Sequence, residues 1–501
     1  MKKSLKTGIA LGLLTLSSAA LASCGGTRIN PYDLDFSVDT NGTSINFWTP
    51  FGSAIQEHVD LICENFEKET GIHVNVETKG GYDNLEKAIT LAAASQKYPH
   101  VALAYPDHMA NYVNSDIIVR LDYYLENDGD DTFKLTDCYK DYLEEVQSVE
   151  FEEAGNGYTL GLPFNKSTEV MCYNKQFFAW AQQTDPSIKV PATWGELATV
   201  GPKIRSFVAN YFGQIVGDDY KTYKSALDLP TGVKALFNFT TVNEDNFFPV
   251  CYDSQANLFI TAVRQWGGTY TEVDKATKKG YLAFDSEEAK SALAYFNELY
   301  EAKVFAVPSC YGGTTTYGSS YFGNCQSVMN IGSSAGVANS IGKTFETGIA
   351  PLPYKDEDKK FVISQGTDAV LLDTGTQVER VAAWKFMKYL TKEADGYFAS
   401  KTSYFPSCDY AAKSKDYQQK VTDTSAKKTY ADVVWYESND VNDKEYLNEA
   451  KKWTKFTDPA FVGSSTVRTE LDTCFSELFI DNLTPAELIA KLKNKLKEYV
   501  K

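Results

Sequence analysis

Between residues 45 and 105 the apolar residues alternate between strand spacing and helix spacing in a regular order. Strand patterns at 45–48, 72–76 and 101–105 enclose two helix patterns, one over 55–66 and one over 85–92, each with apolar residues on one face. Gly71 and Pro99 follow the two helices as stops. Strand, helix, strand, helix, strand with short links predicts right-handed crossovers and a parallel sheet covered on both faces. We therefore expect an α/β fold.

Further along, the same spacing predicts helices over 285–303, 379–390 and 467–478 and strands over 327–331 and 370–372. The chain has 501 residues, far more than one hydrophobic core usually holds, so we expect two lobes. The acidic stretch 126–131 and the polar stretch 413–428 are interpreted as solvated loops or helix faces.

The first residues have the pattern of a secretion signal rather than of a fold element. Lys2, Lys3 and Lys6 precede an apolar run over 8–22, which is too short to span a bilayer, and the run ends at Leu21-Ala22-Ser23-Cys24. The last four residues resemble the bacterial lipobox, which implies that residues 1–23 are removed and Cys24 is acylated. An ordinary signal with a chance cysteine is the alternative. Residues 24–43 are predicted to be a flexible tether.

Net charge and cysteine content limit the kinds of ligand and partner that the protein can bind. The formal net charge is −17 even with three lysines in the leader, which disfavours nucleic acid as a partner. Eight cysteines besides Cys24 are scattered without a CxxC pair, so metal and redox motifs find no support. Disulfides and buried thiols both remain open for these eight.

The sequence indicates neither a metal site nor a pair of catalytic acids. Asp128-Gly129-Asp130-Asp131 lacks the spacing of a calcium loop, and His58, His73, His100 and His108 lack metal-ligand spacing. The adjacent acids Glu144-Glu145 and Glu152-Glu153 are interpreted as solvated faces rather than as a glycosidase pair. There is no P-loop and no GxGxxG. We expect no enzyme, no cofactor and no metal.

Several motifs, in order, resemble the bacterial extracellular solute-binding family 1, which serves ABC importers of sugars and sn-glycerol 3-phosphate, in its lipoprotein form. The resemblance spans 45–492 and rests on Phe47-Trp48, Leu162-Pro163-Phe164-Asn165-Lys166-Ser167-Thr168, Tyr173-Asn174-Lys175, Thr193-Trp194-Gly195-Glu196-Leu197, Phe322-Gly323-Asn324 with Val328-Met329 and Gly332-Ser333-Ser334, Pro351-Leu352-Pro353, and Thr402-Ser403-Tyr404-Phe405-Pro406.

This resemblance implies a two-lobe, type II periplasmic-binding-protein fold that closes on a ligand in the cleft between its lobes. It places lobe 1 at 44–161 and 332–402, and lobe 2 at 162–331 and 403–501. By motif, the ligand contacts of the glycerol-phosphate members correspond to Tyr82, Ser167, Ser333, Gly366, Tyr404 and Arg468. The acid that these members have after the tyrosine of the third strand is replaced by Pro106, with Asp107 one position later. Apart from the resemblance, the aromatic face and polar edge of Trp194 make it a weaker candidate for contact with a sugar or glycerol. Gln365 and Ser403 replace glycines that are usual in the family, which would reshape the pocket.

The residue types suit a buried polar ligand, which needs donors already aimed at it. Ser333 stands before a predicted helix start, where backbone N–H groups favour anions. Arg468 is predicted in the first turn of a helix capped by Ser464-Ser465-Thr466, where a cation is otherwise disfavoured, so a phosphate ligand would explain it. A salt bridge between lobes is the alternative.

Together these observations predict a monomeric solute-binding lipoprotein, held outside the cytoplasm on the membrane by Cys24, that delivers sn-glycerol 3-phosphate, a glycerophosphodiester or a sugar to an ABC permease. A neutral sugar or oligosaccharide is the first alternative ligand. A secreted glycoside hydrolase and a surface adhesin are the distant alternatives.

Overall fold

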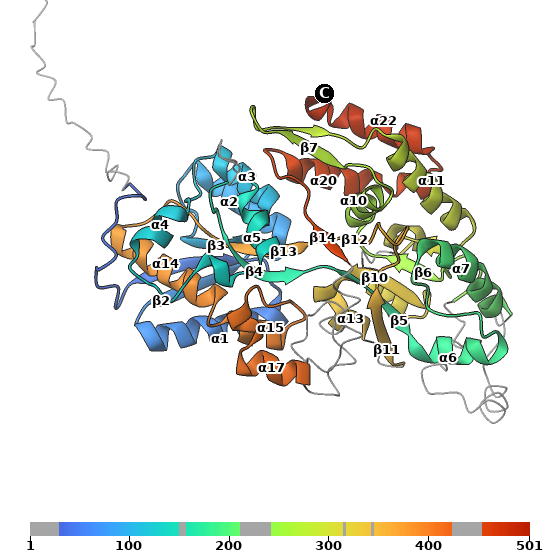
Figure 1. Cartoon of the computed structure of the whole chain (residues 1–501), viewed down its shortest axis with the longest axis horizontal. Helices are drawn as coiled ribbons and strands as arrows, with labels where there is room; N and C mark the ends of the chain where they lie inside the picture. Colours follow the sequence, from blue (N-terminus) through green and yellow to red (C-terminus); the bar gives the residue numbers. More distant parts are fainter. Residues whose placement is uncertain (1–29, 150–156, 211–241, 314–316, 342–344, 423–452) are drawn as a thin grey trace, which may run out of the picture.

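The structure, a computed structural model, describes residues 30–149, 157–210, 242–313, 317–341, 345–422 and 453–501. These residues form two α/β lobes side by side, each built on its own five-stranded sheet (Figure 1). Two separate hydrophobic clusters fill the lobes. No helix within the described ranges combines the length and the apolar character that a membrane crossing requires.

The first lobe contains the predicted parallel strands. Its sheet has the order β2-β1-β3-β13-β4, with β1 Ser44–Thr49, β2 His73–Thr78, β3 Val101–Ala104, β13 Gln365–Leu371 and β4 Leu162–Ser167. The pairs β1–β2 and β1–β3 are parallel, as predicted, whereas β13 runs antiparallel to both of its neighbours.

The predicted helices α1 (Ser53–Thr70) and α2 (Tyr82–Ala93) connect these strands. Helix α1 buries Val59, Ile62 and Phe66 on one face and ends at Gly71. This glycine has a φ of 72° and donates its N–H to the carbonyl of Glu67 at 2.8 Å. That left-handed conformation costs glycine nothing, which is why the helix stops there.

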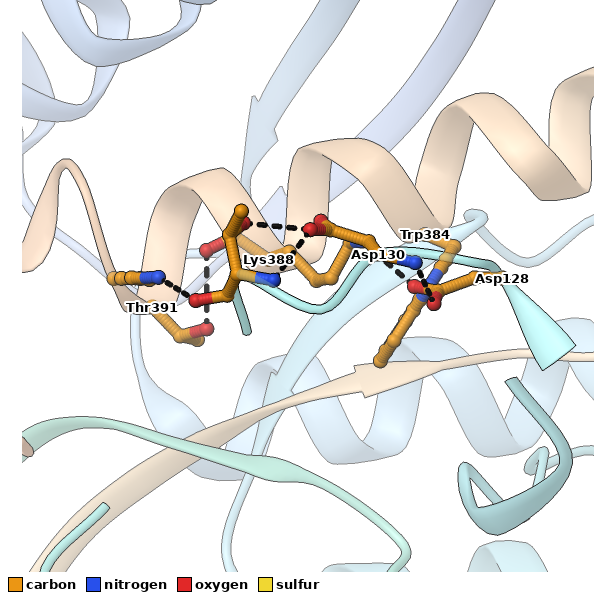
Figure 2. A network of polar contacts seen from close by, with 7 residues as sticks. Asp128, Asp130, Trp384, Lys388 and Thr391 are labelled. Atoms are coloured by element: carbon orange, nitrogen blue, oxygen red, sulfur yellow. Dashed lines mark hydrogen bonds and ion pairs between the residues drawn. The ribbon is translucent and has the colours of Figure 1, made fainter. Parts of the chain in front are cut away.

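Helix α14 (Gln377–Thr391) packs on the same sheet and holds the acidic loop that follows α4 (Asp122–Asn127). Lys388 donates to Asp128 at 2.7 Å and to Asp130 at 2.5 Å, and Trp384 Nε1 donates to the same Asp128 oxygen at 2.7 Å (Figure 2). The side chain of Asp128 is only 6% exposed. The expectation of a solvated acidic loop is therefore wrong for Asp128, whose buried carboxylate is paired with Lys388.

The second lobe has a mixed sheet of order β11-β5-β10-β6-β9, with β11 Thr347–Pro351, β5 Glu169–Asn174, β10 Met329–Ser333, β6 Val250–Tyr252 and β9 Phe305–Ala306. Helices α6 Lys175–Thr184, α7 Trp194–Ala209, α10 Gln255–Gln265, α11 Glu287–Glu301, α20 Ser464–Cys474 and α22 Pro485–Lys495 belong to this lobe. The expected assignment of 332–402 to lobe 1 is wrong for the last two residues of β10 and for β11, which pair with β5 in the second sheet. The expected assignment of 162–331 to lobe 2 is wrong for β4, which pairs with β13 in the first sheet.

The chain passes between the sheets along a few extended segments. Strand β4 ends at Ser167 and β5 begins at Glu169, so the crossing there takes a single residue. Strand β12 (Phe361–Ile363) pairs with β14 (Thr454–Phe456) just before β13, and Figure 1 places both between the lobes. Gly366 on β13 has a φ of 97°, and the register between β13 and β4 shifts beside it.

The segment 30–43, expected to be tether, packs on the first lobe. Leu34 is 8% exposed and its N–H donates to Tyr123 Oη at 3.2 Å. Thr40 is buried and accepts a hydrogen bond from Lys385 Nζ at 3.0 Å. Any flexible tether must therefore precede residue 30, in a part of the chain outside the described residues, where the leader and Cys24 also lie.

All eight cysteines that the described ranges contain carry free thiols, and seven of them are buried. Burial in apolar surroundings raises the pKa of Cys172 and Cys325, each to about 12, so these thiols stay protonated. Of the two alternatives for these cysteines, disulfides and buried thiols, this structure has free thiols, most of them buried.

Candidate functional site

One cavity of about 260 Å³ lies between the lobes. It is lined from the first lobe by α2 and by α3 (Pro106–Asn114), from the second lobe by the start of α20, and from the middle by the segment 363–366. Its volume is near the lower end of the range for ligand pockets, about 300–1,000 Å³. The cavity therefore fits a small solute.

The first lobe contributes an aromatic wall. Tyr82 opens α2 directly after Gly80 and Gly81, whose φ values of 69° and 127° turn the chain into the helix. Its ring lies 5.0 Å from that of Tyr105, and its hydroxyl lies 2.7 Å from the hydroxyl of Tyr404. Burial raises the pKa of Tyr82 and of Tyr404, so both phenols remain neutral hydrogen-bonding groups.

The second lobe contributes Arg468, but its guanidinium already has partners. It donates to Asn257, which in turn donates to Glu169 at 3.0 Å. Asp458 also stands close enough for Arg468 to affect its titration. Burial raises the pKa of Glu169 and of Asp458, each to about 7, against the opposing effect of Arg468. Arg468 is thus held by Asn257 and has two carboxyl groups of the protein nearby, those of Glu169 and Asp458.

Several polar atoms in the cavity wall lack a protein partner. The buried atoms without a hydrogen bond there are Glu145 Oε1, Tyr270 Oη, Ser364 Oγ, Gln365 Oε1 and Asp458 Oδ2. Three of the five are acceptors only, and the two hydroxyls can accept as well as donate. Since an unsatisfied buried polar atom costs about 1–3 kcal/mol, this wall is suited to a ligand that brings hydrogen-bond donors.

Charge within the cavity follows the same trend. Five carboxylic side chains line it, from Asp83, Glu86, Asp107, Glu145 and Asp458, against the single guanidinium of Arg468. One part of the wall differs, because α20 starts there with Ser464 and Ser465 and has no acid in its first turn. The N-terminus of a helix favours negative charge, so this corner is the most anion-tolerant part of the cavity.

The two lobes touch directly beside the cavity. Asn111 on α3 donates to Ser465 Oγ at 3.2 Å and accepts the N–H of Gly463 at 3.2 Å. Glu86 on α2 accepts from the same Asn111 amide at 2.7 Å and from Ser465 at 3.3 Å. These contacts join elements of different lobes, so the structure represents a closed arrangement.

The predicted ligand residues divide into three groups. Tyr82, Asp107, Gly366 and Arg468 line the cavity. Tyr404 lies behind Tyr82 and is only 7% exposed.

Ser167, Ser333 and Trp194 do not line this cavity. Ser167 is 3% exposed and ends β4. Ser333 accepts the N–H of Ala335 at 3.2 Å, but the helical turn that it caps is a short 3₁₀ segment, Ser334–Gly336.

Trp194 starts α7 as predicted, with Thr193 as its cap. It is 1% exposed and donates to Gln265 at 2.7 Å in the core of the second lobe, so the ligand role expected for it is wrong. The expected serine cap of α20 is also wrong, since the helix begins at Ser464 after Gly463, with φ 94°, and Arg468 lies beyond its first turn.

The cavity residues that were not predicted as ligand contacts include four with a buried polar atom that has no partner: Glu145, Tyr270, Ser364 and Asp458. Glu145 was expected on a solvated face, but it is 5% exposed. A signal for it existed, because Glu145 shares the buried face of α5 (Lys140–Gln147) with Tyr142 and Val146. The other three stand in loops or at strand ends, where no periodicity marks an inward position.

Comparisons with known proteins agree with this architecture. The family model of the bacterial extracellular solute-binding protein matches residues 62–448. The sn-glycerol-3-phosphate-binding periplasmic protein UgpB of Escherichia coli strain K12 is 25% identical over 374 residues, covering 73% of this chain and 74% of that protein.

Two solved structures are similar over nearly their whole length. UgpB from Mycobacterium tuberculosis, in complex with glycerophosphocholine, is 16% identical with a TM-score of 0.65, covering 91% of this chain and 98% of that chain. The GacH receptor of Streptomyces glaucescens, solved unliganded and with acarbose, is 15% identical with a TM-score of 0.64, covering 91% of this chain and 98% of that chain. These likenesses confirm the predicted two-lobe fold.

Proposed function

Because this chain belongs to the bacterial extracellular solute-binding family, we propose that it captures a small, hydroxyl-rich solute such as a sugar between its lobes and delivers it to an ABC permease. The observation that carries the choice of solute is the set of buried acceptors without partners: Glu145 Oε1, Gln365 Oε1 and Asp458 Oδ2. Sugar hydroxyls supply the donors that these atoms lack. The tyrosine wall offers apolar faces to the carbon skeleton.

Capture works by closure in this proposal. An open form exposes both walls, and a solute that touches both lobes favours the closed form because it binds that form more tightly. The contacts of Asn111 with Gly463 and Ser465 then add direct bonds between the lobes. The protein binds and releases the solute without chemical change.

A glycerophosphodiester is the second candidate, and one observation favours it. Arg468, Ser464 and Ser465 meet at the start of α20 in the same cavity, where a phosphate could accept their hydrogen bonds. Of the matched UgpB proteins, that of Escherichia coli is named for sn-glycerol 3-phosphate and that of Mycobacterium tuberculosis was solved with glycerophosphocholine. The carboxyl groups of Glu169 and Asp458 beside Arg468 oppose this reading, since they already offset its charge.

A thermal-shift panel followed by calorimetry tests the choice. Glucose, maltose, maltotriose, glycerol 3-phosphate and glycerophosphocholine are compared at equal concentrations, since a ligand that binds only the folded form raises the melting temperature. We expect a neutral sugar to give the largest shift. Binding of glycerol 3-phosphate or glycerophosphocholine with no response to any sugar would replace the first candidate with the second.

The membrane anchor is a separate part of the proposal and rests on the lipobox-like residues Leu21-Ala22-Ser23-Cys24. The family is extracytoplasmic, and acylation of Cys24 would keep the protein at the outer face of the membrane near its permease. Cys24→Ala should release the protein from the membrane fraction. Retention of this variant in membranes with continued incorporation of labelled fatty acid would contradict the anchor.

A further inference from the structure

A buried charged cluster joins the cavity to the strands that lead from one lobe to the other. Lys166 on β4 is completely buried. Its ammonium lies 2.9 Å from Glu145 Oε2 on α5 and 2.6 Å from Asp368 Oδ1 on β13. It also donates to the carbonyl of Gly366 at 3.4 Å. One cation thus holds together a helix and both crossing strands.

The cluster keeps its lysine charged. Burial alone favours the neutral amine, but Asp368 and Glu145 raise the pKa of Lys166. The ring of Tyr142, one turn before Glu145 on α5, lies 5.5 Å from the same ammonium. Lys455 on β14 reaches the hydroxyl of Tyr142 at 3.5 Å. Strands β4, β13 and β14 and helix α5 therefore all contribute to this cluster.

The cluster is incomplete in one respect. Glu145 is 5% exposed, and its second oxygen, Oε1, has no hydrogen-bond partner. Glu145 also lines the cavity. Two carboxyl groups face one ammonium, so a further donor at Oε1 would supply the missing hydrogen bond and stabilise the carboxylate of Glu145.

We propose that Glu145 binds a donor of the captured solute through Oε1, and that Lys166 acts as a positioning residue that couples this contact to β4 and β13 and so to closure of the lobes. This inference rests on the proposed function and deepens it, because it assigns one of the solute contacts. A solute hydroxyl on Oε1 stabilises the carboxylate in the place where Lys166 can bridge it to Asp368. Binding of the solute therefore also stabilises the closed positions of β4 and β13.

The neighbouring acid provides a matched control. Glu144 has a 62% exposed side chain and lies 3.1 Å from Lys140 on the outer face of α5. Glu145→Gln and Glu144→Gln make the same chemical change at consecutive residues of one helix. We expect Glu145→Gln to weaken the affinity for the panel member that the wild type binds by at least tenfold, and Glu144→Gln to leave it unchanged.

A second measurement, independent of affinity, tests whether the Glu145 contact is coupled to closure of the lobes. Small-angle scattering at saturating solute measures the compaction of each variant, and we expect Glu145→Gln to compact less than the wild type. Lys166→Met tests the positioning role through a double-mutant cycle, in which its effect on affinity should be at least threefold smaller in the Glu145→Gln background. If Lys166→Met does not fold, the Glu145 and Glu144 pair still decides the solute contact.

The outcomes separate this inference from the proposed function. A wild type that binds a sugar while Glu145→Gln binds it equally well overturns the inference and leaves the proposed function intact. A wild type that binds no sugar but binds a phosphate ester overturns the proposed solute, and the Glu145 contact is then judged with that ester. Weakened binding with full compaction overturns the role of Lys166 and keeps Glu145 as a solute contact.

Discussion

We expect Asp458→Asn to weaken sugar binding by a calculable amount. Asp458 Oδ2 is buried in the cavity wall without a partner, and burial raises the pKa of this carboxyl to about 7. A hydrogen bond to a charged group contributes about 1.5–3 kcal/mol and a neutral one about 0.5–1.5 kcal/mol. Asparagine keeps the volume and one neutral acceptor, so the variant should lose about 1–1.5 kcal/mol. At about 1.4 kcal/mol for each tenfold change, the dissociation constant rises about 5- to 12-fold.

The loss of sugar affinity in Asp458→Asn should depend on pH. Asp458 is protonated below its raised pKa of about 7 and ionised above it. Only the ionised form offers the stronger hydrogen bond, so the ratio of variant to wild-type dissociation constants should be largest at pH 8 and approach one at pH 5.5. The charges of Arg468 and Arg264, which lower this pKa, do not titrate in that interval.

Calorimetry at the two pH values provides the measurement. Asp481→Asn is the matched control, because Asp481 is an exposed aspartate after helix α21 (Glu477–Ile480) of the same lobe. Melting temperatures in the absence of solute check that both variants are folded. Equal affinity of wild type and Asp458→Asn at pH 8, or a ratio that does not change with pH, would refute the reasoning.

Three further predictions concern closure, the crossing strand and pH. Asn111→Ala should weaken solute binding and reduce compaction in small-angle scattering, since it removes the contacts of α3 with α20; unchanged compaction would contradict this. Gly366→Ala should lower the melting temperature by several degrees, because its φ is 97° and the added Cβ would meet the carbonyl oxygen of Asn165 at 2.1 Å; wild-type stability would contradict this. Asp395 is buried, which raises its pKa to about 7 against an ordinary value near 4, so its contribution to stability is complete below pH 4 and is lost as the pH rises through 7. Asp395→Asn should therefore flatten the decline of the unfolding free energy between pH 5 and pH 8, measured by urea titration, and an unchanged slope would refute the assignment.

The first lobe could be predicted because burial imposes a spacing on the sequence. Residues 45–105 alternate between periods that only strands and helices produce, and each predicted element is present. Spacing does not say which sheet a strand joins. Strand β11 pairs with β5 across a long stretch of chain, and only the fold brings them together. For that reason the expected lobe boundaries failed at β4, at the end of β10 and at β11.

The site was predictable where a turn or helix start shapes it and unpredictable elsewhere. The pair Gly80-Gly81 predicts the turn that places Tyr82 at the start of its helix. The family resemblance predicted Gly366 and Arg468 as ligand contacts, and both line the cavity. Tyr270 and Asp458 come from loops whose inward direction depends on distant packing. Glu145 was partly predictable. The spacing of Tyr142 and Val146 indicates which face of α5 is buried, but the sequence of two adjacent acids does not by itself show that Glu145 rather than Glu144 lies on that face.

Arg468 shows how neighbours decide what a charged residue recognises. Its sequence position predicted a phosphate, yet Glu169 from β5 and Asp458 from a loop lie near it in the fold. Both carboxyl groups have pKa values raised to about 7 by burial, so above pH 7 a phosphate ester in this corner would meet two carboxylates. A phosphate ester should therefore bind more tightly as the pH falls from 8 to 6, whereas a sugar that donates to Asp458 should bind more tightly as the pH rises. The two candidate solutes predict opposite slopes, and calorimetry across this interval distinguishes them without any mutation.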